Sequence, residues 1–156
     1  DHPESNLRMI RESLLKKIPL PPENILAFDT SLTRESAAEE MSRKLTGLSH
    51  ERNPLFDFLI LGAGADGHIA SLFEGEEALF SKELAALSHA AHSAVQDRLT
   101  LTLKALENTS RALLLLKGSE KLAVLQTLEG GSDALRLTAL KHLLEKMTMK
   151  VLAFLK

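Results

Sequence analysis

The chain has 156 residues, of which 44% are apolar and 26% charged, a composition that suits one globular domain covering residues 1–156. Nineteen lysines and arginines against 21 aspartates and glutamates leave a formal net charge of −2, so no basic field suggests a nucleic-acid partner. The lack of cysteine excludes disulfides, thiol catalysis and Cys-based metal sites. No apolar run reaches the ~18 residues that cross a bilayer, so we expect a cytoplasmic protein without a membrane partner.

Helical and extended patterns alternate along the chain. Apolar spacing and capping residues predict four helices. The first is capped by Ser5 or Asn6 and ends at Ile18, and the second is capped by Thr30 or Ser31 and ends near Leu48. The third is capped by Ser119 and ends at Gly130-Gly131, and the fourth runs from Leu137 to Glu145. Short apolar or alternating runs predict strands over 24–28, 56–61, 99–103, 112–116 and 150–155.

This alternation predicts an α/β fold, a Rossmann-like open domain with a mostly parallel sheet and flanking helices. Residues 56–61 (FDFLIL) are nearly all apolar, which is typical of a strand buried on both faces of a parallel sheet. Ligands of open α/β sheets lie beyond the carboxyl ends of the strands. The loops that begin at Asp29, Gly62 and Lys117 are therefore the first places to look for a site.

The loop after Gly62 carries the residues best suited to chemistry. Residues 62–67 match the G-x-G-x-x-G dinucleotide pattern, but Asp66 puts a negative charge where a pyrophosphate needs donors. Asp66-Gly67-His68 instead suits a general base, because imidazole titrates near neutral pH and a carboxylate can orient it. Glycines also let backbone N–H groups face developing negative charge. A tight turn with a merely polar histidine is the alternative that the pattern leaves open.

Residues 66–73, Asp-Gly-His-Ile-Ala-Ser-Leu-Phe, resemble the Asp-Gly-His-x-Ala-Ser-Leu-Phe signature of the 6-phosphogluconolactonase family. Four other segments resemble that family in the same order: His-Pro-Glu-Ser-Asn at 2–6, Pro-Pro-Glu-Asn-Ile at 21–25, Arg-Leu-Thr-Leu-Thr at 98–102 and Gly-Ser-Glu-Lys at 118–121. The resemblance covers most of the chain. It implies hydrolysis of 6-phospho-D-glucono-1,5-lactone, a sugar phosphate of the oxidative pentose phosphate pathway, without metal or organic cofactor.

The resemblance also implies the catalytic residues. His68 would take a proton from the water that attacks the lactone carbonyl and return it to the ring oxygen. Asp66 would hold His68 or support its charge. We infer in addition that N–H groups around Gly64 and Gly67 face the oxyanion, which together with Gly62 makes the glycine loop part of the substrate site.

Two basic residues are implied to bind the substrate phosphate. Lys121 would do so with the free N–H groups at the start of its helix, and Arg98 through a two-pronged contact. Without the resemblance, both read as ordinary surface charges. His89 and His92 stand three apart, but no third ligand is near in sequence, so no metal site is expected.

The sequence also departs from the family pattern. Ala63 and Ala65 replace Met and Pro, Ile69 replaces Thr and Glu74 replaces Pro, while residues 93–97 stand where a proline-rich run is expected. A Gly-Gly-Ser-x-Pro loop and an Asp-Glu-Arg segment are missing from the 156 residues. We therefore expect an N-terminally incomplete domain that is inactive or unstable alone.

Two alternative functions remain. A glucosamine-6-phosphate deaminase or isomerase shares the glycine loop, and Ile69 favours it, but the Ser-Leu-Phe at 71–73 disfavours it. A non-catalytic sugar-phosphate sensor would keep the pocket without turnover.

Overall fold

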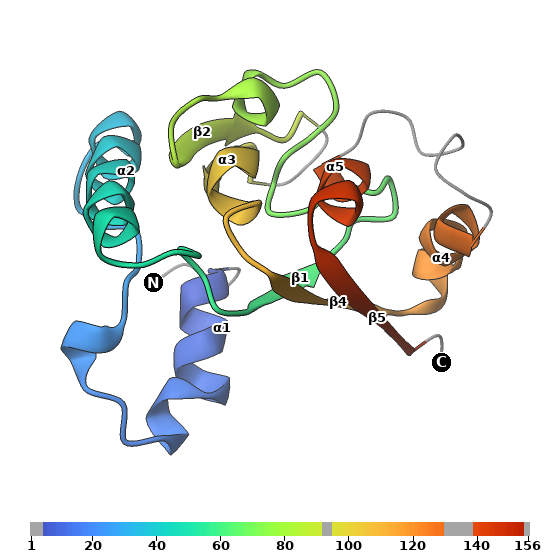
Figure 1. Ribbon diagram of the computed structural model, residues 1–156, viewed down its shortest axis with the longest axis horizontal. Coiled ribbons are helices and arrows are strands. Elements are labelled where there is room, and N and C mark those ends of the chain that lie inside the picture. The colour runs from blue at the N-terminus through green and yellow to red at the C-terminus, as the bar shows by residue number, and fades with distance from the viewer. Residues whose placement is uncertain (1–4, 92–94, 130–138, 155–156) are drawn as a thin grey trace.

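The computed structural model describes residues 5–91, 95–129 and 139–154, and it has the predicted α/β architecture (Figure 1). Its main sheet has three parallel strands in the order β1 (Leu59–Gly62), β4 (Arg111–Lys117) and β5 (Thr148–Phe154). Gly62 lies opposite Leu115 in the register, near the end of β4. Because the strands are parallel, the loops after Gly62 and Lys117 leave the sheet at the same carboxyl edge.

The helices differ from the prediction in both number and bounds, since four are predicted and the described residues form α1 to α5. Two of them, α1 (Asn6–Ser13) and α2 (Arg34–Glu51), precede the sheet. Ser5 caps α1 as predicted, but the helix ends at Ser13 and a 3₁₀ turn, η1 (Leu15–Lys17), follows. Thr33 caps α2, not Thr30 or Ser31 as predicted. Ser31 belongs to a turn before the helix, in which its backbone N–H and its hydroxyl both donate to Asp29.

The later helices are short. They are α3 (Leu103–Leu106), α4 (Leu122–Glu129) and α5 (Ala139–Lys146), with the 3₁₀ turns η2 (Pro22–Asn24), η3 (Glu77–Phe80) and η4 (Ser119–Lys121). The predicted end of α4 at the glycine pair 130–131 and the first residues of the predicted helix 137–145 lie outside the described residues.

Two strand predictions differ from the structure, and one of these strands lies in a second sheet. The run predicted as a strand over 99–103 forms β3 (Asp97–Leu101), which pairs antiparallel with β2 (Ala85–His89), a strand that the sequence did not indicate. The strand predicted over 24–28 is wrong, because η2 occupies its start and residues 25–28 pair with no strand in the described part of the chain. Without a ladder partner, local β propensity does not make a strand.

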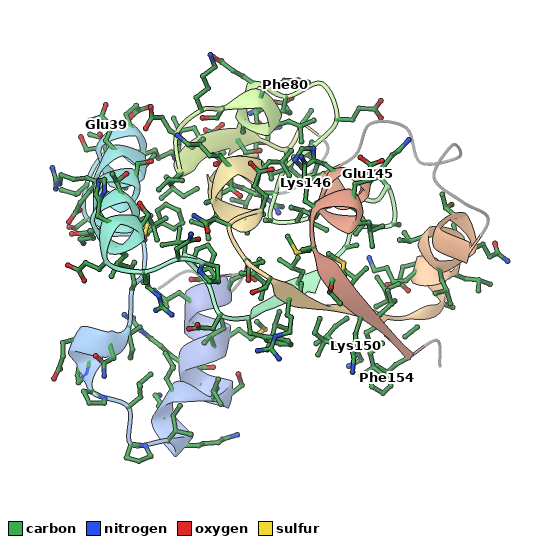
Figure 2. The ribbon with its side chains drawn as sticks, in the orientation of Figure 1. Glu39, Phe80, Glu145, Lys146, Lys150 and Phe154 are labelled. Carbon is green, nitrogen blue, oxygen red and sulfur yellow. The ribbon has the colours of Figure 1, made fainter. Side chains whose placement is uncertain are left out.

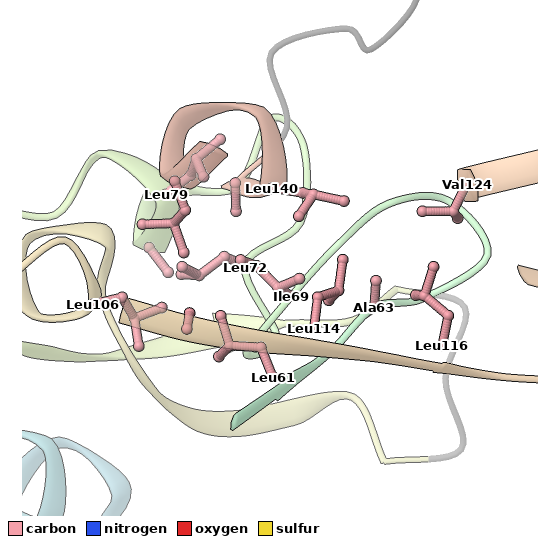
Figure 3. Close-up of a cluster of buried hydrophobic side chains, with 14 residues drawn as sticks. Leu61, Ala63, Ile69, Leu72, Leu79, Leu106, Leu114, Leu116, Val124 and Leu140 are labelled. Carbon is pink, nitrogen blue, oxygen red and sulfur yellow. The ribbon is translucent and has the colours of Figure 1, made fainter. Parts of the chain in front are cut away.

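Two buried clusters hold these elements together. The larger one packs the inner face of the main sheet, through Leu61, Leu114 and Leu116, against α5, which lies above the sheet in Figure 1. Figure 3 shows the glycine loop contributing Ile69 and Leu72 to the same cluster. The smaller cluster packs α2 against the β2–β3 hairpin, and the Ser42 hydroxyl of α2 bonds both backbone groups of Ala85.

The outer face of the main sheet is exposed. Ile60 is 67% exposed, and Leu152 and Phe154 are also on the surface. Figure 2 shows Lys150 and Phe154 extending from β5 on the side away from α5. The expectation that 56–61 forms a strand buried on both faces is therefore wrong for the described residues. Within these ranges, no helix has the length and apolar composition to span a membrane.

Candidate active site

Residues 63–72 form a compact loop at the carboxyl edge of the sheet. Ala63 bridges to Ile69, and the Gly64 N–H donates to the His68 carbonyl over 2.8 Å. Ile69 and Leu72 are buried in the larger cluster, and burying each such side chain stabilises the fold by about 1.5–3 kcal/mol. Because Ile69 points into the core, its neighbour His68 is left at the surface of the loop.

His68 and Asp66 form a close pair. The His68 Nδ1 lies 2.6 Å from the Asp66 Oδ1, and the His68 backbone N–H donates to the same oxygen over 3.2 Å. An ionised carboxylate can only accept, so the shared proton is assigned to Nδ1 and the neutral ring keeps its lone pair on Nε2. The His68 side chain is 27% exposed and that of Asp66 63%, so the pair is open to solvent rather than enclosed in hydrocarbon.

The pair also sets the charge of the carboxyl group. Partial burial raises the pKa of Asp66, but hydrogen bonds from the ring and backbone of His68, with the charge of His68, lower it more. The net result is a pKa below the ordinary value, so Asp66 is ionised at neutral pH.

This lowered pKa predicts a pH-dependent stability. A carboxyl group whose folded pKa is depressed stabilises the fold above its unfolded pKa of about 3.9, and this contribution is lost as the pH falls through the folded pKa. We expect Asp66→Asn to be less stable than the wild type at neutral pH, with the difference closing below about pH 4. Urea unfolding of both proteins from pH 2 to 7 measures it, and a difference that is constant with pH would contradict the assignment.

Position 64 requires glycine, because the side chains of His68 and Asp66 occupy the space that a Cβ atom would take. A Cβ atom at this position would lie 2.2 Å from His68 Nδ1 and 2.4 Å from Asp66 Oδ1. Gly67 adopts a φ of 84°, which suits glycine alone. At Gly62 an added Cβ would meet only the Leu115 carbonyl, at an ordinary 3.9 Å.

The proposed oxyanion donors are not available in this conformation. The N–H of Gly64 donates to the His68 carbonyl, and that of Gly67 donates to the Gly64 carbonyl over 3.1 Å. Both groups therefore close the loop, and the expectation that N–H groups around these glycines face an oxyanion stays a prediction that these two bonds do not support.

After His68, the loop passes through a left-handed turn. Ala70 and Ser71 have φ angles of 48° and 58°, a region that costs non-glycine residues about 1–3 kcal/mol. Two buried hydroxyls of the β2–β3 hairpin hold it, since Thr100 donates to the Ala70 carbonyl and Ser88 to the Ser71 carbonyl. Sequence analysis missed Ser88 entirely and gave Thr100 no role, although polar residues at buried strand positions are a signal for such bonds.

Removing one of these hydroxyls should loosen the turn. Thr100→Val keeps the shape of the side chain but removes the donor to Ala70, so we expect a loss of about 1–3 kcal/mol in the free energy of unfolding. Urea denaturation measures this. The exposed Thr127→Val, which removes a hydroxyl bonded only within α4, serves as the control.

Arg98 on β3 comes close to this loop. Its Nη1 lies 3.4 Å from the Ser71 hydroxyl, and its Cζ lies 6.0 Å from the centroid of the Phe73 ring. Phe73 also contacts His68, at 4.3 Å between ring centroids. The hairpin therefore brings Arg98 to the glycine loop, with Phe73 joining the two.

Lys121 lies on η4, after the carboxyl end of β4. Val124, one turn further on in α4, belongs to the same buried cluster as Ala63 of the glycine loop, as Figure 3 shows. The Nζ of Lys121 is 4.0 Å from the Glu120 carboxylate. The fold thus places Lys121 at the predicted edge, without a hydrogen bond between its side chain and the loop in the described part of the chain.

Two histidines outside this loop, His89 and His142, are paired with acids. His89 lies 3.1 Å from Asp97, which also binds Arg34, and His142 lies 2.9 Å from Glu107. His92 lies outside the described residues. Among the residues that are described, no group of three or more His, Cys, Asp or Glu is arranged to hold a metal ion.

A parallel sheet with a histidine–carboxylate pair on the loop beyond its carboxyl edge places this chain in the class of open α/β proteins, which bind their ligands at that edge as a rule. The sequence profile of the family described as glucosamine-6-phosphate isomerases/6-phosphogluconolactonase matches residues 1–142. The chain belongs to this family.

Individual relatives agree with this assignment. A 6-phosphogluconolactonase of Rattus norvegicus is 39% identical over 129 residues, covering 81% of this chain and 50% of that protein. The crystal structure of 6-phosphogluconolactonase from Thermotoga maritima is 29% identical, with a TM-score of 0.80, covering 99% of this chain and 67% of that one. A monomeric glucosamine-6-phosphate deaminase, 19% identical with a TM-score of 0.78, shares the fold. The chain spans about half the length of the curated relatives it matches.

Proposed function

We propose that this protein hydrolyses 6-phospho-D-glucono-1,5-lactone to 6-phosphogluconate, with His68 as general base. The observation that carries the proposal is the His68–Asp66 pair on the glycine loop at the carboxyl edge of the sheet. Relatives named 6-phosphogluconolactonase, at 34–39% identity, support the choice of substrate.

The reaction needs one proton acceptor that can later act as a donor. The lone pair on His68 Nε2 takes a proton from water while the water oxygen bonds to the lactone carbonyl carbon. As the tetrahedral intermediate collapses, the bond from this carbon to the ring oxygen breaks, and the ring oxygen takes the proton from Nε2. The products are a carboxylic acid, which ionises in water, and a free hydroxyl group.

Asp66 fits the role of orienting the base. Its bond to Nδ1 selects the tautomer with the lone pair on Nε2, and its charge stabilises the imidazolium that forms during the reaction. Because the pKa of Asp66 is lowered, this charge is present throughout the neutral range.

The substrate phosphate requires cations at a distance from the lactone carbonyl. The Arg98 guanidinium lies 6.0 Å from the centroid of the Phe73 ring, which also contacts His68, and a guanidinium group can bind two phosphate oxygens at once. Lys121 lies at the same edge of the sheet and supplies a second positive charge. We assign both to phosphate binding.

The direct test compares two substrates. The purified full-length protein is incubated with 6-phosphogluconolactone, with acid release followed against the spontaneous rate, and separately with glucosamine 6-phosphate, with ammonia release followed. Lactone hydrolysis above the spontaneous rate is the expected result. Ammonia release would indicate the deaminase instead, and binding of 6-phosphogluconate without turnover of either substrate would indicate a sensor.

A further inference from the structure

Phe73 is the last residue of the signature segment, and the mechanism above gives it no role. Its ring contacts two residues of the proposed site: its centroid is 4.3 Å from that of the His68 imidazole, with the planes tilted by 42°, and 6.0 Å from the Arg98 Cζ. The ring is partly buried, so it is supported by the protein while still contacting both polar groups.

The backbone on both sides of Phe73 is held in place. Leu72 precedes it, is buried in the larger cluster, and donates its N–H to the Ile69 carbonyl over 2.7 Å. The Phe73 carbonyl accepts from the N–H of Glu76 over 3.3 Å. The ring is thus attached to an anchored segment, and it can serve as a fixed surface for its neighbours.

Two contacts orient Arg98, and one of them is with the segment of Phe73. The Arg98 Nε donates to the Val95 carbonyl over 3.1 Å, and its Nη1 lies 3.4 Å from the hydroxyl of Ser71, two residues before Phe73. A guanidinium group about 6 Å from an aromatic centroid is also attracted by the face of the ring.

His68 needs a second restraint that Asp66 alone does not supply. The Asp66 Oδ1 accepts from both the His68 backbone N–H and Nδ1, but this contact holds the imidazole at one atom of its edge only. An aromatic ring packed against the imidazole limits its rotation about both side-chain torsions.

We propose that Phe73 is a positioning residue that holds the His68 imidazole and the Arg98 guanidinium at a set separation. A sugar phosphate bound through Arg98 then presents its lactone carbonyl to His68 Nε2. This inference rests on the proposed function for its catalytic consequence, but not for the side-chain restraint itself.

The test compares ring-retaining and ring-removing substitutions. Phe73→Leu keeps an apolar side chain without an aromatic face, whereas Phe73→Tyr keeps the face. Since a displacement of about 1 Å at a reacting group lowers the rate by about 10²-fold, we expect Phe73→Leu to lower kcat/KM for the lactone by about 10–10²-fold. The kcat should fall because His68 is misplaced relative to the lactone carbonyl, and the KM should rise because Arg98 is misplaced relative to the substrate phosphate. The kcat/KM of Phe73→Tyr should stay within about 3-fold of the wild-type value, because the retained aromatic face keeps His68 and Arg98 in place.

The matched control is Phe80→Leu, since Phe80 is 73% exposed on η3 and lies at the periphery in Figure 2. It should leave kcat and KM unchanged. Thermal unfolding of every variant gives the folded fraction, and rates are compared per folded molecule. Equal losses of folding and activity in both Leu and Tyr variants would show that Phe73 is merely structural and would overturn the proposal.

A measurement without substrate separates this inference from the proposed function. Three-bond NMR couplings of His68 report whether its χ1 torsion is fixed or averaged. We expect a single rotamer in the wild type and Phe73→Tyr, and averaging in Phe73→Leu. Averaging in the Leu variant of a protein that does not hydrolyse the lactone would support the restraint while the proposed function fails. Unchanged couplings in the Leu variant would overturn the restraint, whatever the activity.

Discussion

Replacing His68 by asparagine is expected to lower lactone hydrolysis by about 10²–10⁴-fold, the usual contribution of a general base. Asparagine is close to histidine in size and can still donate a hydrogen bond to Asp66, so the loop keeps its shape. It has no lone pair of suitable basicity to accept the proton of the attacking water. Binding of 6-phosphogluconate should therefore remain near the wild-type level while turnover is lost.

Two measurements check this expectation. Initial rates of acid release give the activity, and isothermal titration with 6-phosphogluconate gives the affinity. His50→Asn, on the exposed end of α2, is the matched control and should change neither. If His68→Asn hydrolysed the lactone at the wild-type rate, His68 would not be the base, and a wild type that binds but does not turn over would favour the sensor.

Gly64→Ala is expected to lower turnover by at least about 10²-fold with little loss of stability, because it displaces a reacting group. The added Cβ would lie 2.2 Å from His68 Nδ1 and 2.4 Å from Asp66 Oδ1, which is far inside van der Waals contact. The atoms that must move belong to side chains at the surface, so the backbone and the buried residues Ile69 and Leu72 keep their places. The substitution thus disturbs the pair and spares the fold.

Gly47→Ala is the control for this prediction. A Cβ at Gly47, within α2, would meet no atom within 4 Å, and alanine in a helix is about 0.5–1 kcal/mol more favourable than glycine. Its activity should equal the wild type and its free energy of unfolding should rise slightly. Measured rates and urea unfolding separate the two variants. Full activity of Gly64→Ala would show that the His68–Asp66 geometry is not needed for catalysis.

The glycine loop was predictable because its residues are contiguous. Asp66 and His68 are two positions apart, and the strand before them places the loop at the carboxyl edge of any parallel sheet. Their direct contact follows from this short spacing and from Gly64, which leaves room for it. The sheet itself was predictable for the same local reason, since β4 and β5 are apolar runs of strand length.

The contacts of the loop with the hairpin were not predictable. The left-handed φ angles of Ala70 and Ser71 occur in residues that give no sequence signal for them, since glycine is the usual indicator. They persist because Ser88 and Thr100, 17 and 30 residues away along the chain from their partners, bond the carbonyls of the turn. The strand predicted over 24–28 is the opposite case, in which a local signal was present but the distant contact was not. Its residues have β propensity but no pairing partner among the described residues, and they form no strand.

The sequence by itself determined the α/β class, the position of the glycine loop and the presence of a histidine beside a carboxylate. These features depend on periodicity and on neighbours only a few residues apart, which chain connectivity brings together in any fold. Only the tertiary structure decided that Phe73 contacts both His68 and Arg98, that the Gly64 and Gly67 N–H groups close the loop, and that one face of the sheet is exposed. Such features depend on which distant segments pack together, and that is set by the burial of the whole core rather than by any local pattern.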